Sequence, residues 1–112
     1  MHELSITQSI VAIVDEAAQG RRVIRVTLEV GKLSGVVSDS IAFCFDIVAA
    51  GTALEGASLD IREIEGRGRC ESCGSEFATE TLFAVCACGS HRWKLTQGEE
   101  LNVKSMELEE AA

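Results

Sequence analysis

The sequence has no proline and no tyrosine, and its aromatic side chains are limited to four phenylalanines and one tryptophan. Without proline no rigid linker separates parts of the chain, and with so few aromatic residues aliphatic side chains must build the core. The chain has 112 residues, of which 46% are hydrophobic, which is typical of a globular protein. This length is enough for one domain, or for one domain with a small module that is stabilised by cross-links.

Basic residues are also scarce, because 10 Lys and Arg stand against 18 Asp and Glu and give a net charge of −8. Such a chain repels phosphate backbones and acidic membranes, so neither nucleic acid nor a membrane is an expected partner. The N-terminus lacks the basic and apolar regions of a signal peptide, and no run of about 18 apolar residues could span a bilayer. We therefore expect a cytoplasmic protein.

Four of the five cysteines form two close pairs, Cys70-x-x-Cys73 and Cys86-x-Cys88. In a reducing compartment such pairs are more often metal ligands than disulfides, and four clustered thiolates suit zinc. Two ligand sets compete: the four cysteines, or a set in which His91 replaces Cys86, because the spacing from Cys88 to His91 is that of an ordinary knuckle. Soft-ligand preference favours the four cysteines. A redox pair or plain buried thiols are the alternatives without metal.

Hydrophobic periodicity predicts a helix followed by a strand in the first part of the chain. Ser5 and Gln8 form a capping box, apolar residues then recur at helical spacing, and Gly20 supplies the C-terminal stop. Residues 24–30 alternate between apolar and polar side chains, which is the pattern of a half-buried strand.

A second helix and two more strands are predicted in the rest of the chain. The helix ends near Gly51, and three residues could cap its start: Ser38, Asp39 or Ser40. The alternating segments 59–62 and 101–104 predict strands. Between them, residues 67–97 hold the cysteine pairs and too few large apolar residues for an adequate core, so zinc would supply the missing stability.

The first three residues are Met1, His2 and Glu3. The imidazole of a second-position histidine can bind a metal beside the free α-amine and the next backbone amides, an all-nitrogen set that favours square-planar Ni(II) or Cu(II). A histidine this close to a chain end can also be without a metal role, or cap a helix. No phosphate-binding loop, nucleophile elbow or Cys/His catalytic pairing is found, so we do not expect an enzyme.

Four stretches carry a family resemblance: MHELSITQSIV, IAFCFDIVAAGTALEGASLDI, the paired cysteines with CGS, and GEELNVKSMELEE. Together they resemble the HypA/HybF hydrogenase nickel-incorporation proteins over nearly the whole chain. The resemblance implies a nickel metallochaperone that acts in the maturation of [NiFe]-hydrogenase. It also implies two partners, the GTPase HypB and the hydrogenase large subunit, and the protein could form a homodimer.

By the same resemblance, His2 is the essential nickel ligand. The Met1 amine and the backbone amides of His2 and Glu3 would complete a planar set, and the Glu3 side chain could tune the site or supply an oxygen ligand. The resemblance also implies that the nickel is cargo, whereas zinc is structural.

The resemblance assigns Cys70, Cys73 and Cys88 to the structural zinc site. The family pattern places the third cysteine where this chain has Val85, and here Cys86 stands one place later. We expect Cys86 to complete a four-cysteine set.

The implied fold is α+β, with two helices on a three-stranded sheet and an inserted zinc-ribbon-like module. The nickel-binding domain comprises residues 1–66 and is completed by the last strand in 98–112, and the zinc-binding module comprises 67–97.

Two other functions share some of these features. A zinc-ribbon nucleic-acid adaptor would need a basic patch with exposed aromatic residues, against which the acidic balance argues. A zinc-dependent redox sensor would need an accessible thiolate of low pKa and would release zinc on mild oxidation.

Overall fold

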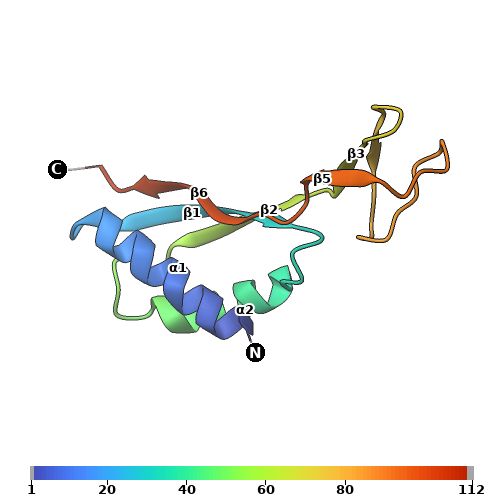
Figure 1. Ribbon diagram of the computed structural model, residues 1–112. Helices are drawn as coiled ribbons and strands as arrows, with labels where there is room; N and C mark the ends of the chain where they lie inside the picture. Colours follow the sequence, from blue (N-terminus) through green and yellow to red (C-terminus); the bar gives the residue numbers. More distant parts are fainter. Residues whose placement is uncertain (1, 111–112) are drawn as a thin grey trace. The chain divides into compact units, whose positions relative to one another are not determined.

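The computed structural model describes residues 2–110 with the exception of the His2 side chain, and the chain divides into two compact units (Figure 1). The first unit is built from three segments: Met1–Glu29, Val37–Arg62 and Asn102–Ala112. The second unit is built from Val30–Val36 and Glu63–Leu101. Each unit therefore joins segments that are distant in the sequence.

Helix α1 (His2–Ala18) buries one face in the first unit. The buried side chains of this face are Thr7, Ile10, Val11, Val14 and Ala18. After Ala18, Gln19 and Gly20 adopt left-handed backbone conformations with φ of 50° and 84°, so the predicted stop at Gly20 is confirmed. The predicted capping box is wrong, because the helix begins at His2 and Ser5 lies inside its first turns.

Strand β1 (Val23–Gly31) confirms the predicted strand, but the alternation is incomplete: Ile24, predicted on the buried face, is 42% exposed, and Thr27, predicted on the polar face, is buried. Val26, Leu28 and Val30 are at most 2% exposed, whereas Arg25 on the other face is exposed. The two helices lie on one side of this strand (Figure 1).

Helix α2 (Ser38–Ala49) contributes Ile41, Phe45 and Ala49 to the same core. Its N-cap is Val37, which has no side chain able to cap, and Ser38 lies inside the helix; the three predicted capping residues are therefore wrong. In the described part of the chain, neither helix has the length and apolar character needed to cross a bilayer.

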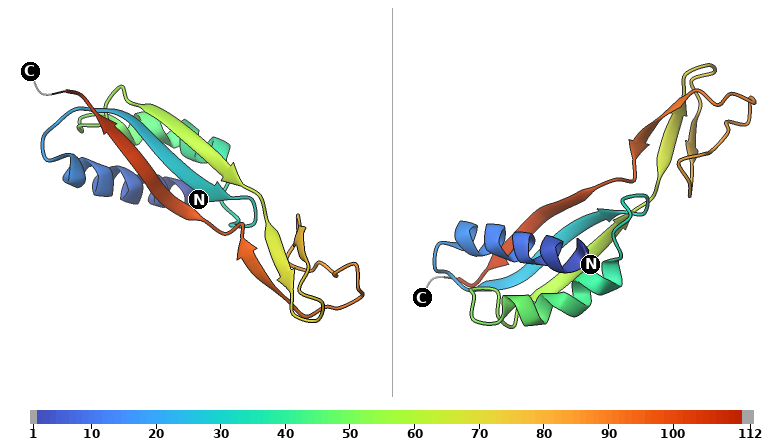
Figure 2. Two further views of the ribbon diagram at one scale, coloured as in Figure 1. Left: turned by 90° about the horizontal axis from the view of Figure 1, so that it is seen from above. Right: turned by 60° about the horizontal axis from the view of Figure 1, so that its bottom comes forward.

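The first sheet has the strand order β2-β1-β6, with β2 at Ser58–Ile64 and β6 at Leu101–Leu108. Figure 2 shows β1 and β2 running in parallel and β6 running against them. The residue after β6 is linked to the residue before β1 by a hydrogen bond of 2.8 Å from the Glu109 N–H to the Arg22 carbonyl. Both helices cover one face of this sheet, which confirms the predicted arrangement of two helices on three strands.

The second sheet lies in the second unit and has the order β4-β3-β5, all antiparallel. Its strands are β3 (Arg67–Cys70), β4 (Glu76–Ala78) and β5 (Trp93–Gln97). The sequence did not predict these strands, because segments of four, three and five residues are too short to show a period.

The core of the second unit is formed around a glycine. A Cβ on Gly68 would lie 2.4 Å from an atom of the Trp93 ring, so the ring packs directly on the β3 backbone. The Phe77 ring meets Trp93 edge to face, with centroids 5.4 Å apart. Beyond this cluster, the buried apolar side chains of the described second-unit residues that follow β1 are the thiols Cys70 and Cys86. Such a core is small for independent stability.

Candidate metal sites

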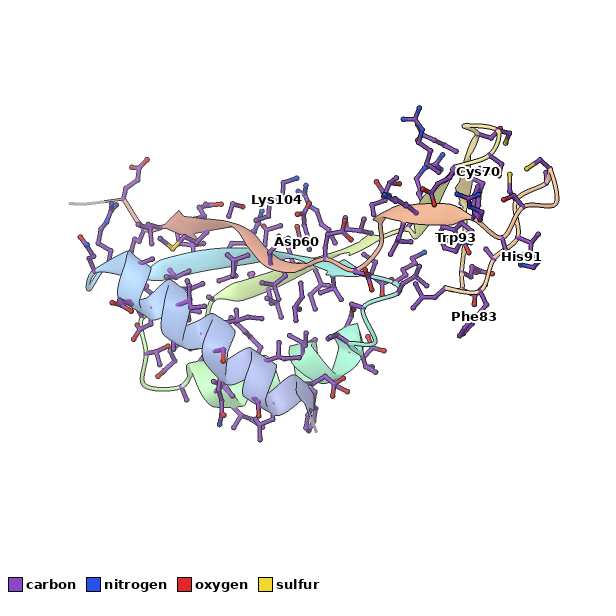
Figure 3. All side chains as sticks on the ribbon, in the orientation of Figure 1. Asp60, Cys70, Phe83, His91, Trp93 and Lys104 are labelled. Atoms are coloured by element: carbon purple, nitrogen blue, oxygen red, sulfur yellow. The ribbon has the colours of Figure 1, made fainter. Side chains whose placement is uncertain are left out.

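Four thiols converge at one end of the second unit. Their Sγ atoms all lie within 4.8 Å of one another and belong to Cys70, Cys73, Cys86 and Cys88. Figure 3 shows the sulfur atoms gathered where the turn after β3 faces the loop that leads to β5. The structure thus brings together the two pairs that the sequence pattern singled out.

The spacing of the sulfur atoms can be compared with a tetrahedral metal site. Two Sγ pairs bridge the knuckles: Cys70 to Cys88 at 3.7 Å, and Cys73 to Cys86 at 3.6 Å. Zinc–sulfur bonds of about 2.3 Å in a regular tetrahedron separate the sulfurs by about 3.8 Å. These two separations match a tetrahedral zinc site, and the remaining sulfur pairs, which lie within 4.8 Å, would have to close by no more than about 1 Å.

The first knuckle follows directly from β3. The Cys70 N–H donates to the Ser75 carbonyl at 2.8 Å, and the Gly74 N–H donates back to the Cys70 carbonyl at 3.0 Å. The N–H groups of Ser72 and Cys73 point at the Cys70 sulfur, at 3.3 and 3.4 Å. Gly74 permits this turn because its φ of 77° is left-handed.

The second knuckle is one residue shorter and closes differently. The Gly89 N–H donates to the Cys86 carbonyl at 2.8 Å. This hydrogen bond joins residues three positions apart, whereas the corresponding bond of the first knuckle, from Gly74 to Cys70, joins residues four positions apart. The Cys86 N–H donates to the Ser90 carbonyl at 3.0 Å, and Gly89 has a φ of 91°. This tighter turn allows Cys86 and Cys88 to share the cluster even though Cys86 stands one place later than the family pattern.

Contacts between the two knuckles hold the pairs together. The hydroxyls of Ser72 and Ser90 form a hydrogen bond of 2.9 Å, and the Glu71 N–H donates to the Arg92 carbonyl at 2.8 Å. The Trp93 indole N–H donates to the Ala84 carbonyl at 2.7 Å and fixes the loop before the second knuckle. The ligand cluster is therefore organised by the backbone and by residues beside the thiols.

The thiols differ in acidity. The hydrogen bond from the Cys73 N–H lowers the pKa of Cys70 to about 6, and contact with the Ser75 hydroxyl lowers the pKa of Cys73. The Cys88 N–H acts to lower the pKa of Cys86, but burial and contact with the neighbouring thiols raise this pKa to about 12. A cation bound here would displace the remaining protons, because thiolates are the metal ligands.

His91, the alternative ligand, is exposed on the loop between the second knuckle and β5 (Figure 3). Its imidazole is not in the group of converging ligand atoms.

At the N-terminus, Met1 and the side chain of His2 lie outside the described residues. The Glu3 carboxylate accepts a hydrogen bond of 3.1 Å from the N–H of Val37, the N-cap of α2. This bond, together with one from its own backbone N–H, lowers the pKa of Glu3. The sequence did not reveal this contact, because residues 3 and 37 are brought together only by the packing of α1 on α2.

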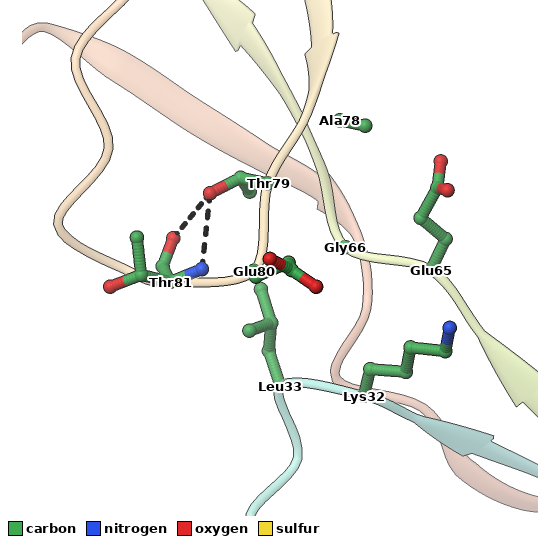
Figure 4. Close-up of a pocket in the computed structure, with 8 residues that line it drawn as sticks. All are labelled: Lys32, Leu33, Glu65, Gly66, Ala78, Thr79, Glu80 and Thr81. Atoms are coloured by element: carbon green, nitrogen blue, oxygen red, sulfur yellow. Dashed lines mark hydrogen bonds between the residues drawn. The ribbon is translucent and has the colours of Figure 1, made fainter.

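A groove of about 750 Å³ also lies in the second unit, away from the thiols (Figure 4). Its lining residues are Lys32, Leu33, Glu65, Gly66, Ala78, Thr79, Glu80 and Thr81. The Thr79 hydroxyl donates to the Thr81 carbonyl at 2.7 Å and accepts from the Thr81 N–H at 3.1 Å, which holds one wall. Among the described residues, the carboxylates that line this groove belong to no metal-ligand group. Its volume alone does not make the groove a candidate metal site.

Comparisons with known proteins give a consistent result. The family model described as hydrogenase/urease nickel incorporation, metallochaperone, hypA matches residues 1–108. The chain is 56% identical over 110 residues to the hydrogenase maturation factor HypA of Nostoc sp., covering 98% of this chain and 97% of that protein. It is 54% identical over 110 residues to the factor of the same name from Geobacter metallireducens, covering 97% and 100%.

Two solved structures share the fold. One, described as a solution structure of HypA protein, is 28% identical, has a TM-score of 0.72 and covers 96% of each chain. The other is the solution structure of the Ni metallochaperone HypA from Helicobacter pylori, with 24% identity and a TM-score of 0.65, covering 95% of this chain and 96% of that one.

Proposed function

The chain belongs to the HypA family of hydrogenase and urease nickel-incorporation metallochaperones, and we propose that it binds Ni(II) at its N-terminus and delivers the ion to a [NiFe]-hydrogenase precursor. The observation that carries this proposal is the family match from residue 1 onward, which includes the Met-His-Glu start. The protein holds and transfers an ion and catalyses no covalent step.

The proposed nickel ligands are the Met1 α-amine, the His2 imidazole and the backbone amides of His2 and Glu3. Helix α1 begins at His2, so these amides belong to its first turn and lie outside the helix's own i to i−4 hydrogen bonds. A metal can therefore replace their protons without breaking that ladder. An all-nitrogen planar set of this kind suits Ni(II).

The Glu3 side chain has a positioning role in this proposal. Its carboxylate holds the Val37 N–H at the start of α2, which fixes the first turn of α1 against a second helix. We propose that the Glu3 amide coordinates nickel and that the Glu3 carboxylate anchors α1 to the start of α2.

The proposed role of the four cysteines is to hold a structural zinc ion. The support is the fit of the sulfur separations, 3.6 and 3.7 Å across the knuckles, together with the small core of the second unit. When bound, zinc supplies four metal–sulfur bonds that link the two knuckles. Cys70 and Cys86 would hold the ion from the buried side, whereas Cys73 and Cys88 are exposed.

The two functions are divided between two proposed domains. Residues 1–66 with 98–112 form the nickel-binding domain, and residues 67–97 form the zinc-binding module. A HypB-type GTPase and the hydrogenase large subunit are the proposed partners, since the curated relatives are named as hydrogenase maturation factors. An ion held at a chain end is accessible to such partners, whereas an ion bound by four thiolates has no ligand position left open for transfer.

Complementation tests the delivery function. The gene is expressed in bacteria that lack their own nickel-incorporation protein, and nickel-dependent hydrogenase activity is measured at limiting nickel. We expect activity with the native protein and with His91→Ala, and loss of activity with His2→Ala at equal protein levels. Full activity of the His2→Ala variant would contradict the proposal.

A further inference from the structure

One face of the β4-β3-β5 sheet is basic although the whole chain is acidic. Four of the ten basic residues occupy alternate positions, so that each pair points to one face: Arg67 and Arg69 on β3, and Arg92 and Lys94 in the segment that leads into β5. Arg69, Arg92 and Lys94 are exposed. The opposite face of the sheet carries Gly68, Phe77 and Trp93, which pack on one another.

The strand register places two of these cations directly opposite each other. Arg69 is the cross-strand partner of Lys94 on β5, and its partner on β4 is Glu76. Like charges in such positions destabilise a sheet. Arg67 forms an ion pair with Glu65 at 3.3 Å, but among the described residues no ion pair neutralises Arg69, Arg92 or Lys94.

A groove of about 530 Å³ lies along this cross-strand pair. Its lining residues are Arg69, Cys70, Glu71, Gly74, Lys94, Leu95 and Thr96. The Thr96 hydroxyl donates to the Arg67 carbonyl at 3.1 Å, which ties β5 to β3 along the groove. The groove thus combines a preformed β-sheet floor with two cations and falls in the usual size range of binding clefts, about 300–1,000 Å³.

We propose that this groove binds an acidic segment of another protein, with side-chain carboxylates facing Arg69 and Lys94. Charge complementarity supports this occupant, because three exposed cations without ion pairs are concentrated on one face of a chain with net charge −8. A single carboxylate between Arg69 and Lys94 would relieve their repulsion.

The same face is poorly suited to nucleic acid. Glu71 lines the groove and Glu76 flanks Arg69, so successive phosphates would meet carboxylates. No aromatic residue lines the groove on which a base could stack. This proposal does not depend on the nickel site, and failure of either leaves the other standing.

The test uses the full-length, zinc-loaded protein labelled with ¹⁵N and titrated with a short polyglutamate peptide, blocked at both ends, at low salt. We expect saturable shifts at residues 67–71 and 92–96. Arg69→Gln and Lys94→Gln should each weaken binding by about two- to fivefold, as for exposed ion pairs. Lys104→Gln is the matched control, because Lys104 is an exposed cation on β6 and should not affect binding.

Three results would overturn the proposal. The first is equal binding of a polyglutamine peptide, and the second is equal affinity of the double variant Arg69→Gln/Lys94→Gln with unchanged zinc content. The third is tighter binding of a single-stranded oligonucleotide than of the polyglutamate peptide, which would assign the face to nucleic acid.

Discussion

At the scale of the residue, Cys86 is the least regular of the four thiols and the most informative. It is 6% exposed, its pKa is raised to about 12, and it lies one place away from the family pattern. Its backbone nevertheless closes the second knuckle through Gly89 and Ser90. A shorter turn thus brings the Cys86 thiol into the four-cysteine cluster despite its shifted position.

The substitution Cys86→Ser should therefore weaken zinc binding by more than the roughly 10–100-fold typical of changes outside the ligand shell, because one of four ligands is lost. His91→Ala, the matched control, should leave zinc content unchanged at neutral pH. Zinc content after dialysis and X-ray absorption of the native protein provide the measurements. Zinc retained in Cys86→Ser together with a shell of three sulfurs and one nitrogen would show instead that His91 is the ligand.

The direction in which zinc affinity changes with pH follows from the pKa values of the thiols. Cys86 keeps its proton at neutral pH because its pKa is raised to about 12, whereas the pKa of Cys70 is lowered to about 6. Zinc binding must release the Cys86 proton, so zinc affinity should fall as the pH falls.

At the scale of the element, sequence patterns succeeded where a period repeats over many residues. Helix α1 and strand β1 were predictable because they have seventeen and nine residues, which is long enough for the spacing of apolar residues to repeat. Strands β3 and β4 were not, since their pairing depends on the register with β5 and on the ring of Trp93 over Gly68. Contacts distant in sequence leave no local period.

The caps of the helices show the same limit. A local rule assigned Ser38 or a neighbour to the start of α2, but the cap comes from Glu3, which is 34 residues away in sequence. Tertiary packing thus replaced a local capping residue.

Replacing Glu3 tests this contact between the two helices. Glu3→Ala should lower the Tm by a few degrees, because the α2 cap is lost, whereas Glu16→Ala on the exposed face of α1 should have little effect. Since the folded-state pKa of Glu3 is lowered, its stabilisation is complete at neutral pH and disappears as the pH falls below the usual carboxyl range. Thermal unfolding followed by circular dichroism at several pH values is the measurement.

An equal Tm for Glu3→Ala and the native protein at pH 7 would show that the Glu3–Val37 bond contributes nothing to the fold. A loss that persists unchanged at low pH would show that the effect is one of packing and not of charge.

At the scale of the whole molecule, composition predicted the average charge but not its distribution. The net charge of −8 correctly describes an acidic chain, yet the β3 and β5 strands concentrate basic residues such as Arg69 and Lys94 on one face. A mean value cannot reveal a pairing that arises only when two strands come together. The cysteine pairs were visible in the sequence because their spacing is local.

The two units should respond differently to loss of zinc. Chelation should remove amide-exchange protection across residues 67–97 and leave the helices and β1 protected, because their core contains Leu28, Ile41 and Phe45 whereas the second unit buries little besides its thiols. Zinc binding to small modules contributes about 10–16 kcal/mol, which is comparable to the stability of a whole domain. Uniform loss of protection along the chain would show that the two units do not fold independently.

Equilibrium dialysis against Ni(II) tests directly whether the N-terminal residues of this chain bind nickel. The native protein and His91→Ala should each bind one tight nickel ion per chain, and His2→Ala should lose that site while its zinc content and circular dichroism stay unchanged. Extension of the chain before Met1 should weaken nickel binding as well, because the α-amine is removed. Native nickel affinity in His2→Ala would contradict nickel binding at the N-terminus.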